Sequence, residues 1–442
     1  MAKELPDHSS ILVKLADGTV KQRNMLTGTE VWTVPGRGHR PLTVPPVDEH
    51  PIDDDTIGSV CAFCPQRYLD TPPEKARVVL DAAGTMRQIR DVRASQLNDT
   101  HALFRRVPNL FEIVSFDYWA KNHGVEPSAE QRRRMAEYLS EPEGYDHVLS
   151  IVKTRLRAIG MRPDDIADLS EDDLVRRATG FFAGGHDLII GRRHYTDSAE
   201  TSSQLASAGT LPVDEHEAYT RLTISTMRDL YGLSDKVRYV SAFQNWLKPA
   251  GASFDHLHKQ LVAIDEYPVA TIAELRRLHD HPDSYAAILK LCATRGLLLA
   301  QNDGAVAMIG VGHRYPTLAI WPLGEPCAPW EAPESIVRCV SDLLHACHAA
   351  TGADVPVNEE WYHRPLSVHR PMRWRILLKW RISTLAGFEG GTRIYLNTLD
   401  PWTIRDRVLP RLLTLRSSGA INPMRLGDEC KISPHDLAGS IG

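Results

Sequence analysis

Residues 239–265 read YVSAFQNWLKPAGASFDHLHKQLVAID, and their pattern of apolar and polar residues predicts both strands and a site. Its apolar pieces predict two strands within residues 237–264, joined by a turn at residues 248–251. His256, His258 and Gln260 occupy every second position, so in a strand their side chains would lie on one face. Buried strand faces are normally lined with Val, Ile or Leu. Three polar side chains on such a face therefore indicate a functional site.

His258 is the candidate nucleophile of this site. A neutral imidazole can attack a phosphorus atom in line and form a phosphoramidate, which a second substrate later cleaves. Charge placement lowers most of the remaining barrier in phosphoryl-type transfer, so cationic and amide donors are expected near the phosphates. Gln260 would be one of these donors.

Four further polar residues could contact the phosphates or a nucleotide. Arg37 and Arg40, in PGRGHRP, could supply positive charge, or they could lie on a solvated loop. Asn245 and Ser253 flank the histidine motif and could hydrogen-bond nucleotide or phosphate, or they could be turn residues. The residues alone leave these alternatives open.

A different reading makes both histidines of the HxH pair metal ligands, as in cupins and metallo-hydrolases. A cupin-type site would want a glutamate where Val262 or Ala263 stands, and an HxHxD site would want aspartate in place of Gln260. The spacing therefore argues against this reading.

A separate metal site is indicated by Cys61 and Cys64. CxxC places two thiolates on one turn, where they can share a tetrahedral metal with ligands from elsewhere in the fold. His194 and His256 are the candidates to complete a Cys2His2 set, and these ligands suit zinc. The alternative is a pair of buried or redox-active thiols.

The bulk composition favours a small-molecule partner. The 442 residues imply two or three domains, or two fused halves. A formal net charge of -5 offers no basic field for nucleic acid or an anionic membrane. The N-terminus lacks the pattern of a signal peptide and no apolar run could span a bilayer, so we expect a cytoplasmic protein. Seven cysteines, five of them scattered, predict no disulfide framework.

The order of predicted elements favours an α+β fold made of antiparallel sheets packed with helices. Helices are expected at about residues 127–175, where Glu, Arg, Leu and Ala dominate. Strands at 305–310 and 316–321, a helix at 333–351 and strands at 374–382 and 393–396 repeat the pattern of the first half. We therefore expect an internal duplication, with halves at residues 1–270 and 271–442.

Several blocks together carry a family resemblance. They are WTVPGRGHRP, CAFCPQRYLDTPPEK, RVPNLFE, GHDLIIGRRHY, the stretch ending in HLHKQ, and AGFEGGTRIYLNTLDP. In this order they resemble the galactose-1-phosphate uridylyltransferase family of the histidine triad superfamily, which also includes ADP-glucose phosphorylases. The resemblance covers most of the chain outside residues 127–175.

The resemblance implies two histidine-triad-like halves plus a helical insertion at about 127–175, and a homodimer. It implies a ping-pong nucleotidyltransferase in which a nucleoside diphosphate sugar leaves its nucleotide on a histidine and a phosphorylated acceptor removes it. The implied roles are zinc ligation by Cys61, Cys64, His194 and His256, nucleotidyl transfer by His258 with Gln260, and substrate contacts by Arg37, Arg40, Asn245 and Ser253. A phosphorylase or hydrolase of the same superfamily and a non-catalytic nucleotide-binding protein are the alternatives.

Departures from the family pattern leave the donor and the acceptor open. Asp255, Leu257 and Lys259 replace the family's usual residues around the histidines. Arg373-Trp374-Arg375 stands where some members have an HWH metal motif, and because a guanidinium is no metal ligand we expect that second site to be absent. The two arginines could bind an anionic acceptor or lie on a strand surface.

Overall fold

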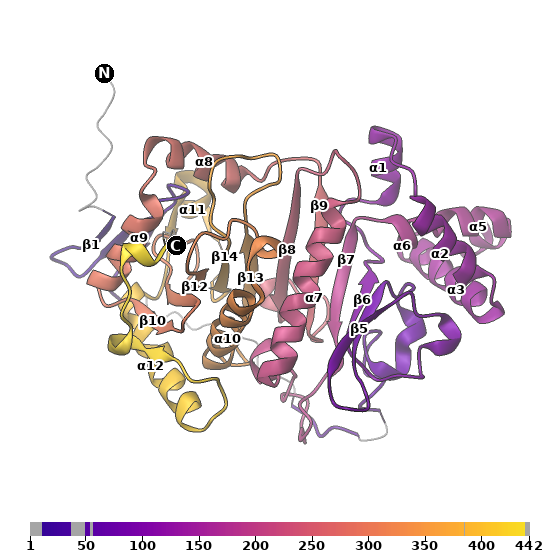
Figure 1. Cartoon of the computed structure of the whole chain (residues 1–442), viewed down its shortest axis with the longest axis horizontal. Coiled ribbons are helices and arrows are strands. Elements are labelled where there is room, and N and C mark those ends of the chain that lie inside the picture. Colours follow the sequence, from indigo (N-terminus) through magenta and orange to yellow (C-terminus); the bar gives the residue numbers. More distant parts are fainter. Residues whose placement is uncertain (1–10, 37–48, 54–55, 384, 438–442) are drawn as a thin grey trace.

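The computed structural model describes residues 11–36, 49–53, 56–383 and 385–437. Its centre is a single twelve-stranded antiparallel sheet with the order β16-β10-β11-β12-β14-β13-β8-β9-β7-β6-β4-β5 (Figure 1). Helices pack on this sheet, so the fold is α+β as predicted. The strands are β4 Ala76–Leu80, β5 Met86–Arg90, β6 Ala102–Pro108, β7 His186–Gly191, β8 Tyr239–Trp246, β9 His258–Ile264, β10 Leu298–Gln301, β11 Ala305–Ile309, β12 Thr317–Pro322, β13 Val357–Tyr362, β14 Arg375–Trp380 and β16 Arg425–Leu426.

The sheet has an internal two-fold pattern. From its centre outward, one half runs β8, β9, β7, β6, β4 and the other runs β13, β14, β12, β11, β10. The halves meet where β8 pairs antiparallel with β13, with Phe243 opposite Glu360. Each half also has one long helix at the equivalent place in the chain. Residues 213–231 form it between β7 and β8, and residues 334–351 form it between β12 and β13. The topology is therefore a duplication, while the boundary at residue 270 stays a prediction.

Two long helices cover one face of the sheet, namely α7 (Val213–Tyr231) and α10 (Glu334–Thr351). They lie side by side in front of the sheet in Figure 1, and α7 contacts β7, β8 and β9 while α10 contacts β11, β12 and β14. Acidic residues occupy the first turn of α7, where they favour the helix dipole, and apolar residues at helical spacing form its buried stripe. These two helices leave the opposite face of the sheet uncovered, and the candidate functional site lies on that face.

The predicted helical insertion is longer than expected. Six helices follow one another between β6 and β7: α1 Phe116–His123, α2 Ala129–Leu139, α3 Pro142–Ala158, α4 Pro163–Ala167, α5 Glu171–Arg177 and α6 Thr179–Ala183. They gather at one end of the sheet and have their own apolar core, which includes Tyr138, Val152 and Phe181 (Figure 1). Serine caps at the starts of α1, α2 and α5 fix their first turns.

A smaller four-stranded sheet joins an N-terminal segment of the chain to a strand of its C-terminal half. It contains β1 Leu12–Lys14, β2 Val20–Arg23, β3 Glu30–Thr33 and β15 Ile394–Leu396, with β15 parallel to β3. The remaining helices are α8 Val269–Asp280, α9 Ser284–Thr294, α11 Gly387–Thr392 and α12 Pro401–Ser417. Among the described residues, no helix is long and apolar enough to cross a membrane.

Candidate functional site

Four residues from three separate segments meet beside the start of β9. Cys61 and Cys64 lie on a turn before β4, His194 follows β7, and His256 lies in the bend that precedes β9. Each can offer one ligand atom, and the four atoms lie within 4.8 Å of one another. The structure thus brings together all four residues that the sequence predicted for a metal site.

The spacing of the four atoms fits a tetrahedral ion. The two sulfur atoms are 3.8 Å apart, and the Nδ1 atoms of His194 and His256 are 3.3 Å apart. The four sulfur-to-nitrogen distances are 3.5, 3.5, 3.6 and 3.8 Å. Zinc bonds of about 2.3 Å to sulfur and about 2.0–2.1 Å to nitrogen, at tetrahedral angles, require edges of about 3.8, 3.3 and 3.5 Å respectively. The site can therefore hold a metal ion of this size.

The second nitrogen of His256 is fixed by the neighbouring strand. Its Nε2 lies 2.6 Å from the backbone oxygen of Gly191, and since a carbonyl can only accept, Nε2 carries the proton. The lone pair is therefore on Nδ1, which faces the two cysteines, as is usual for a ligating histidine. The sequence predicted His256 and His258 on one strand, whereas β9 begins at His258 and His256 lies in the bend just before it.

His258 is the first residue of β9 and is almost fully buried, at 4% exposed. Its Nδ1 donates a hydrogen bond of 2.8 Å to the backbone oxygen of His256. Burial lowers the pKa of His258, which favours the neutral ring. The lone pair is then on Nε2. The ring of Phe63 lies edge-on at 5.3 Å between centroids, so access to this imidazole is narrow.

Gln260 lies on the same face of β9, and its side-chain oxygen is fixed by two residues that sequence reasoning missed. His186 Nε2 lies 3.1 Å from Gln260 Oε1, and the Asn109 amide donates to the same oxygen at 3.4 Å. The backbone N–H of Ile113 donates to His186 Nδ1, so Nε2 carries the proton and is the donor. Burial lowers the pKa of His186 to about 4, which keeps the ring neutral.

This arrangement gives Gln260 a defined direction. Its oxygen is occupied, whereas its amide nitrogen has no hydrogen-bond partner among the described residues. That nitrogen can therefore donate to a ligand beside His258. The sequence signals His186 only as one of two polar residues, with Asp187, that open the strand β7. Its position pairs with Val262, two residues beyond Gln260.

The four residues predicted to contact substrate are only partly placed. Asn245 lies on β8, where its oxygen accepts a hydrogen bond of 2.7 Å from Asn358 of the other half. Ser253 is exposed in the loop between β8 and β9. Arg37 and Arg40 lie outside the described residues.

The structure corrects the expectation that Arg373 and Arg375 could be surface charges. Both are buried, at 8% and 3% exposed. Arg373 donates to the backbone oxygens of Leu437 and Pro322. Arg375 forms an ion pair with Glu274 of α8, with a bond of 2.8 Å. Buried guanidinium groups need such partners, and the sequence spacing gives no sign of them.

Comparisons with known proteins agree with this architecture. The model of a family described as "Domain of unknown function (DUF4921)" matches residues 15–438. Curated proteins give no match in sequence. A crystal structure of an ADP-glucose phosphorylase from Arabidopsis thaliana with bound ADP-glucose is 18% identical, with a TM-score of 0.56 over 88% of this chain and 97% of its own. A galT-like protein from the same plant is 17% identical, with a TM-score of 0.54 over the same shares.

At these identities the two structures show a common fold. They match the family that the sequence motifs resembled, and they span nearly the whole chain in both directions. The chain belongs to the DUF4921 family, and its fold is that of ADP-glucose phosphorylase and galT-like proteins.

Proposed function

We propose that this protein is a nucleotidyltransferase that acts on a nucleoside diphosphate sugar or a related nucleotide through a covalent intermediate on His258. The observation that carries the proposal is the fixed state of this ring. A backbone carbonyl holds the proton on Nδ1, burial favours the neutral form, and the lone pair is therefore on Nε2. Such an imidazole is a competent nucleophile toward phosphorus.

The reaction has two displacement steps. In the first, the Nε2 lone pair forms a bond to the α-phosphorus of the donor, and the bond from that phosphorus to the bridging oxygen breaks, releasing the sugar phosphate. In the second, an oxygen of the acceptor attacks the same phosphorus and the bond to Nε2 breaks, which restores neutral His258. The free amide of Gln260 donates to a phosphate oxygen as negative charge develops there.

The metal in this proposal is zinc with a structural role. Bound by Cys61, Cys64, His194 and His256, it would tie the turn at residues 61–64 to β7 and to the start of β9. All four positions of a tetrahedral site would be filled by protein atoms, which is typical of structural sites. His256 would thereby fix the carbonyl that accepts from His258.

The proposed donor is inferred from the similarity of this protein to known proteins. The structure of ADP-glucose phosphorylase with the same fold contains ADP-glucose, and the sequence motifs resemble a family that uses nucleoside diphosphate sugars. Asn245, Ser253, Arg37 and Arg40 would contact the nucleotide and its phosphates in this proposal, and the protein would be a homodimer. The acceptor would be a sugar 1-phosphate, inorganic phosphate or water.

The intermediate can be tested by intact mass. Purified protein is incubated with diphosphate sugars of uridine, adenosine, guanosine, cytidine and thymidine, without acceptor, and its mass is measured. We expect an added nucleoside monophosphate with one of these donors. The His258→Asn variant should lack the adduct, while His279→Asn, which changes an exposed histidine of α8, should keep it. An adduct that persists in His258→Asn would overturn the assignment of the nucleophile.

A second incubation, of the protein that has the nucleoside monophosphate adduct, identifies the acceptor. Loss of the adduct on adding a sugar 1-phosphate indicates a transferase, loss on adding phosphate indicates a phosphorylase, and loss in buffer alone indicates a hydrolase. A protein that is stabilised against heat by a nucleotide but never forms an adduct or product with any donor would instead be a nucleotide-binding protein, and the proposal would be wrong.

A further inference from the structure

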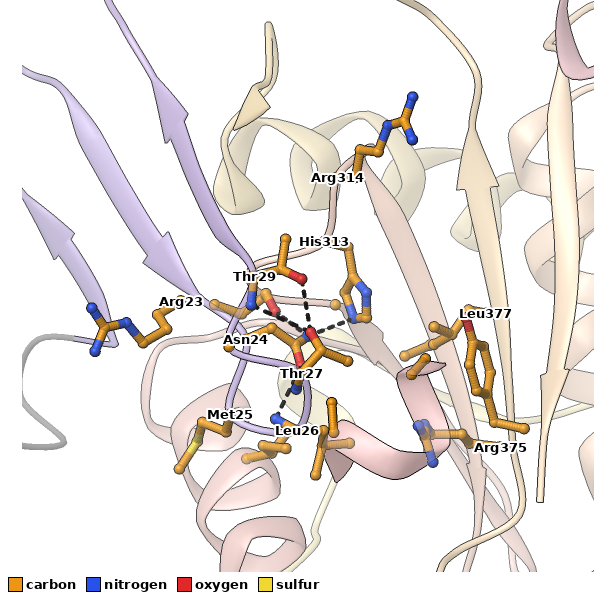
Figure 2. Close-up of a pocket in the computed structure, with 18 of the residues that line it drawn as sticks. Arg23, Asn24, Met25, Leu26, Thr27, Thr29, His313, Arg314, Arg375 and Leu377 are labelled. Atoms are coloured by element: carbon orange, nitrogen blue, oxygen red, sulfur yellow. Dashed lines mark hydrogen bonds between the residues drawn. The ribbon is translucent and has the colours of Figure 1, made fainter. Parts of the chain in front are cut away.

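The second half of the sheet carries a cavity of about 600 Å³ on the face that carries His258 in the first half. Arg375 is the first residue of β14, as His258 is the first residue of β9, and the two strands occupy equivalent places in the two-fold pattern. Figure 2 shows the loop at residues 24–29 on one side of this cavity and Arg375 and Leu377 on the other, with His313 between them. The cavity thus takes the place that the nucleophile's site has in the first half.

The charged side chains of its lining are all basic. Five lining side chains are basic, and none is acidic: Arg23, Arg314, Arg375, Lys379 and Arg393. Three of these cations have carboxylate partners, but the partners, Glu30, Glu274 and Glu360, are not part of the lining. Carboxylates outside the lining therefore compensate three of the five cations, and the excess positive charge of the wall comes from the other two.

Two of the cations have no carboxylate partner among the described residues. Arg314 packs its guanidinium over the ring of Tyr395, at 5.4 Å, and its buried Nε has no hydrogen-bond partner in the described part of the chain. Arg393 is exposed just before β15. Figure 2 places Arg314 at an edge of the cavity. These two arginines are free to bind a negatively charged group there.

His313 adds a neutral donor. The amide nitrogen of Asn24 lies 3.3 Å from its Nε2, which must therefore accept, so the proton is on Nδ1. That N–H has no hydrogen-bond partner among the described residues. Burial, with the charges of Lys379 and Arg375, lowers the pKa of His313 to about 3 and keeps the ring neutral.

The rest of the wall is apolar or aromatic, including Leu26, Leu291, Met308, Trp321, Tyr362 and Leu377. A cavity of this size holds a ligand of a few tens of atoms, and its polar groups set the ligand's orientation. We propose that the cavity binds an organic anion, with its phosphate or carboxylate at Arg314 and Arg393 and a planar or apolar body against the sheet. Because an arginine replaces the nucleophile, this would be a binding site without covalent chemistry.

This chemistry occurs both in nucleoside monophosphates, which have a planar base, and in fatty acids, which have an alkyl chain. We would titrate the full chain with the common nucleoside monophosphates and with decanoate by calorimetry. Arg314→Gln/Arg393→Gln should weaken binding of one of these two classes by about tenfold or more, since it removes the charged hydrogen bonds to the anionic group. Ala273→Phe, which places a ring in the cavity, should abolish the part of the binding that the arginine pair weakens.

Two controls separate this site from the first half and from misfolding. Arg177→Gln, an exposed arginine of α5 at the other end of the molecule, should bind like the wild type. His258→Asn should lose the covalent adduct but keep the binding that Ala273→Phe abolishes, because His258 is not part of the cavity. Thermal unfolding of each variant shows that it is folded, and the arginine pair and Ala273→Phe are independent probes. The proposal is overturned if neither class binds, or if all binding survives both cavity variants.

Discussion

The amine of Lys259 lies 2.6 Å from Oε1 of Glu359, and both side chains are fully buried. Lys259 directly follows His258 on β9, while Glu359 lies on β13, so this ion pair joins the two halves of the sheet beside the proposed nucleophile. His348 of α10 binds the other carboxylate oxygen at 2.8 Å. Burial acts to raise the pKa of Glu359, but Lys259 and His348 lower it by a larger amount. The net pKa is therefore well below its usual range.

We predict that Lys259→Met lowers the free energy of unfolding by about 3–5 kcal/mol, because it leaves Glu359 charged, buried and without its main partner. Urea unfolding of the purified variant measures this loss. Lys121→Met is the matched control: its ion pair with Asp117 is exposed and contributes about 0–1 kcal/mol. If the two variants lose the same stability, the buried pair does not have the role assigned to it.

The hydrogen bond from His186 to Gln260 leads to a kinetic prediction. In His186→Leu, the oxygen of Gln260 loses its buried donor and the amide no longer has a fixed direction toward the phosphate. A shift of about 1 Å in a catalytic group can cost about a hundredfold in rate, so we expect a loss of this order in kcat with a smaller change in KM. Steady-state kinetics with the donor found by mass measure both constants.

His147→Leu is the control for removing a buried histidine. His147 lies in the core of the helical insertion and binds Tyr138 and the backbone oxygen of Thr71, away from Gln260. It should lose stability but keep kcat. Equal losses of kcat in the two variants would mean that His186 acts only through the stability of the fold.

Elements with clear periodicity were predictable from the sequence. The strands β11, β12 and β14 and the helix α10 lie within a few residues of the predicted ranges, because apolar spacing and flanking Pro or Gly mark them. The gathering of Cys61, Cys64, His194 and His256 was also predictable, since CxxC spacing has few uses in a chain without a disulfide framework.

The parts that were missed depend on partners that are distant in the chain. The strand β13 reads VNEEWY, which looks polar, and it becomes a central strand because Glu359 finds Lys259 and His348 in the interior. His186 likewise looks like an ordinary strand residue until β9 places Gln260 beside it. Local sequence patterns contain no information about such distant pairing. The roles of these residues could therefore be recognised only in the three-dimensional structure.

Metal binding is predicted to stabilise the fold. Removal of zinc by a chelator, or Cys61→Ser, should lower the melting temperature and remove about one metal ion per chain. Metal at about 100–1,000 times its dissociation constant contributes about 3–4 kcal/mol to the folded state. Metal analysis and thermal unfolding measure the two effects. Cys327→Ser is the control, because this half-buried cysteine lies outside the cluster and should keep both metal and stability. Protein purified without chelator that contains no zinc would rule the site out.

The carboxyl group of Glu112 predicts a pH dependence of stability. Burial raises its pKa to about 7 from an ordinary value of 4.5, and its Oε1 has no hydrogen-bond partner among the described residues. Between pH 4.5 and about 7 the folded protein keeps a proton that the unfolded chain has released, so this group's contribution to stability falls as the pH rises through that window.

Glu112→Gln removes the titrating group but keeps the size of the side chain. Relative to wild type, the variant should therefore be more stable at pH 8 than at pH 5 by about 1–3 kcal/mol, because each unit of pKa shift corresponds to about 1.4 kcal/mol. Urea unfolding at the two pH values gives the difference. Glu334→Gln, whose side chain is 91% exposed, should change the free energy of unfolding by about 0.5 kcal/mol or less at both values. If the free energy of unfolding of Glu112→Gln changes with pH by the same amount as that of the wild type, Glu112 does not titrate in this window.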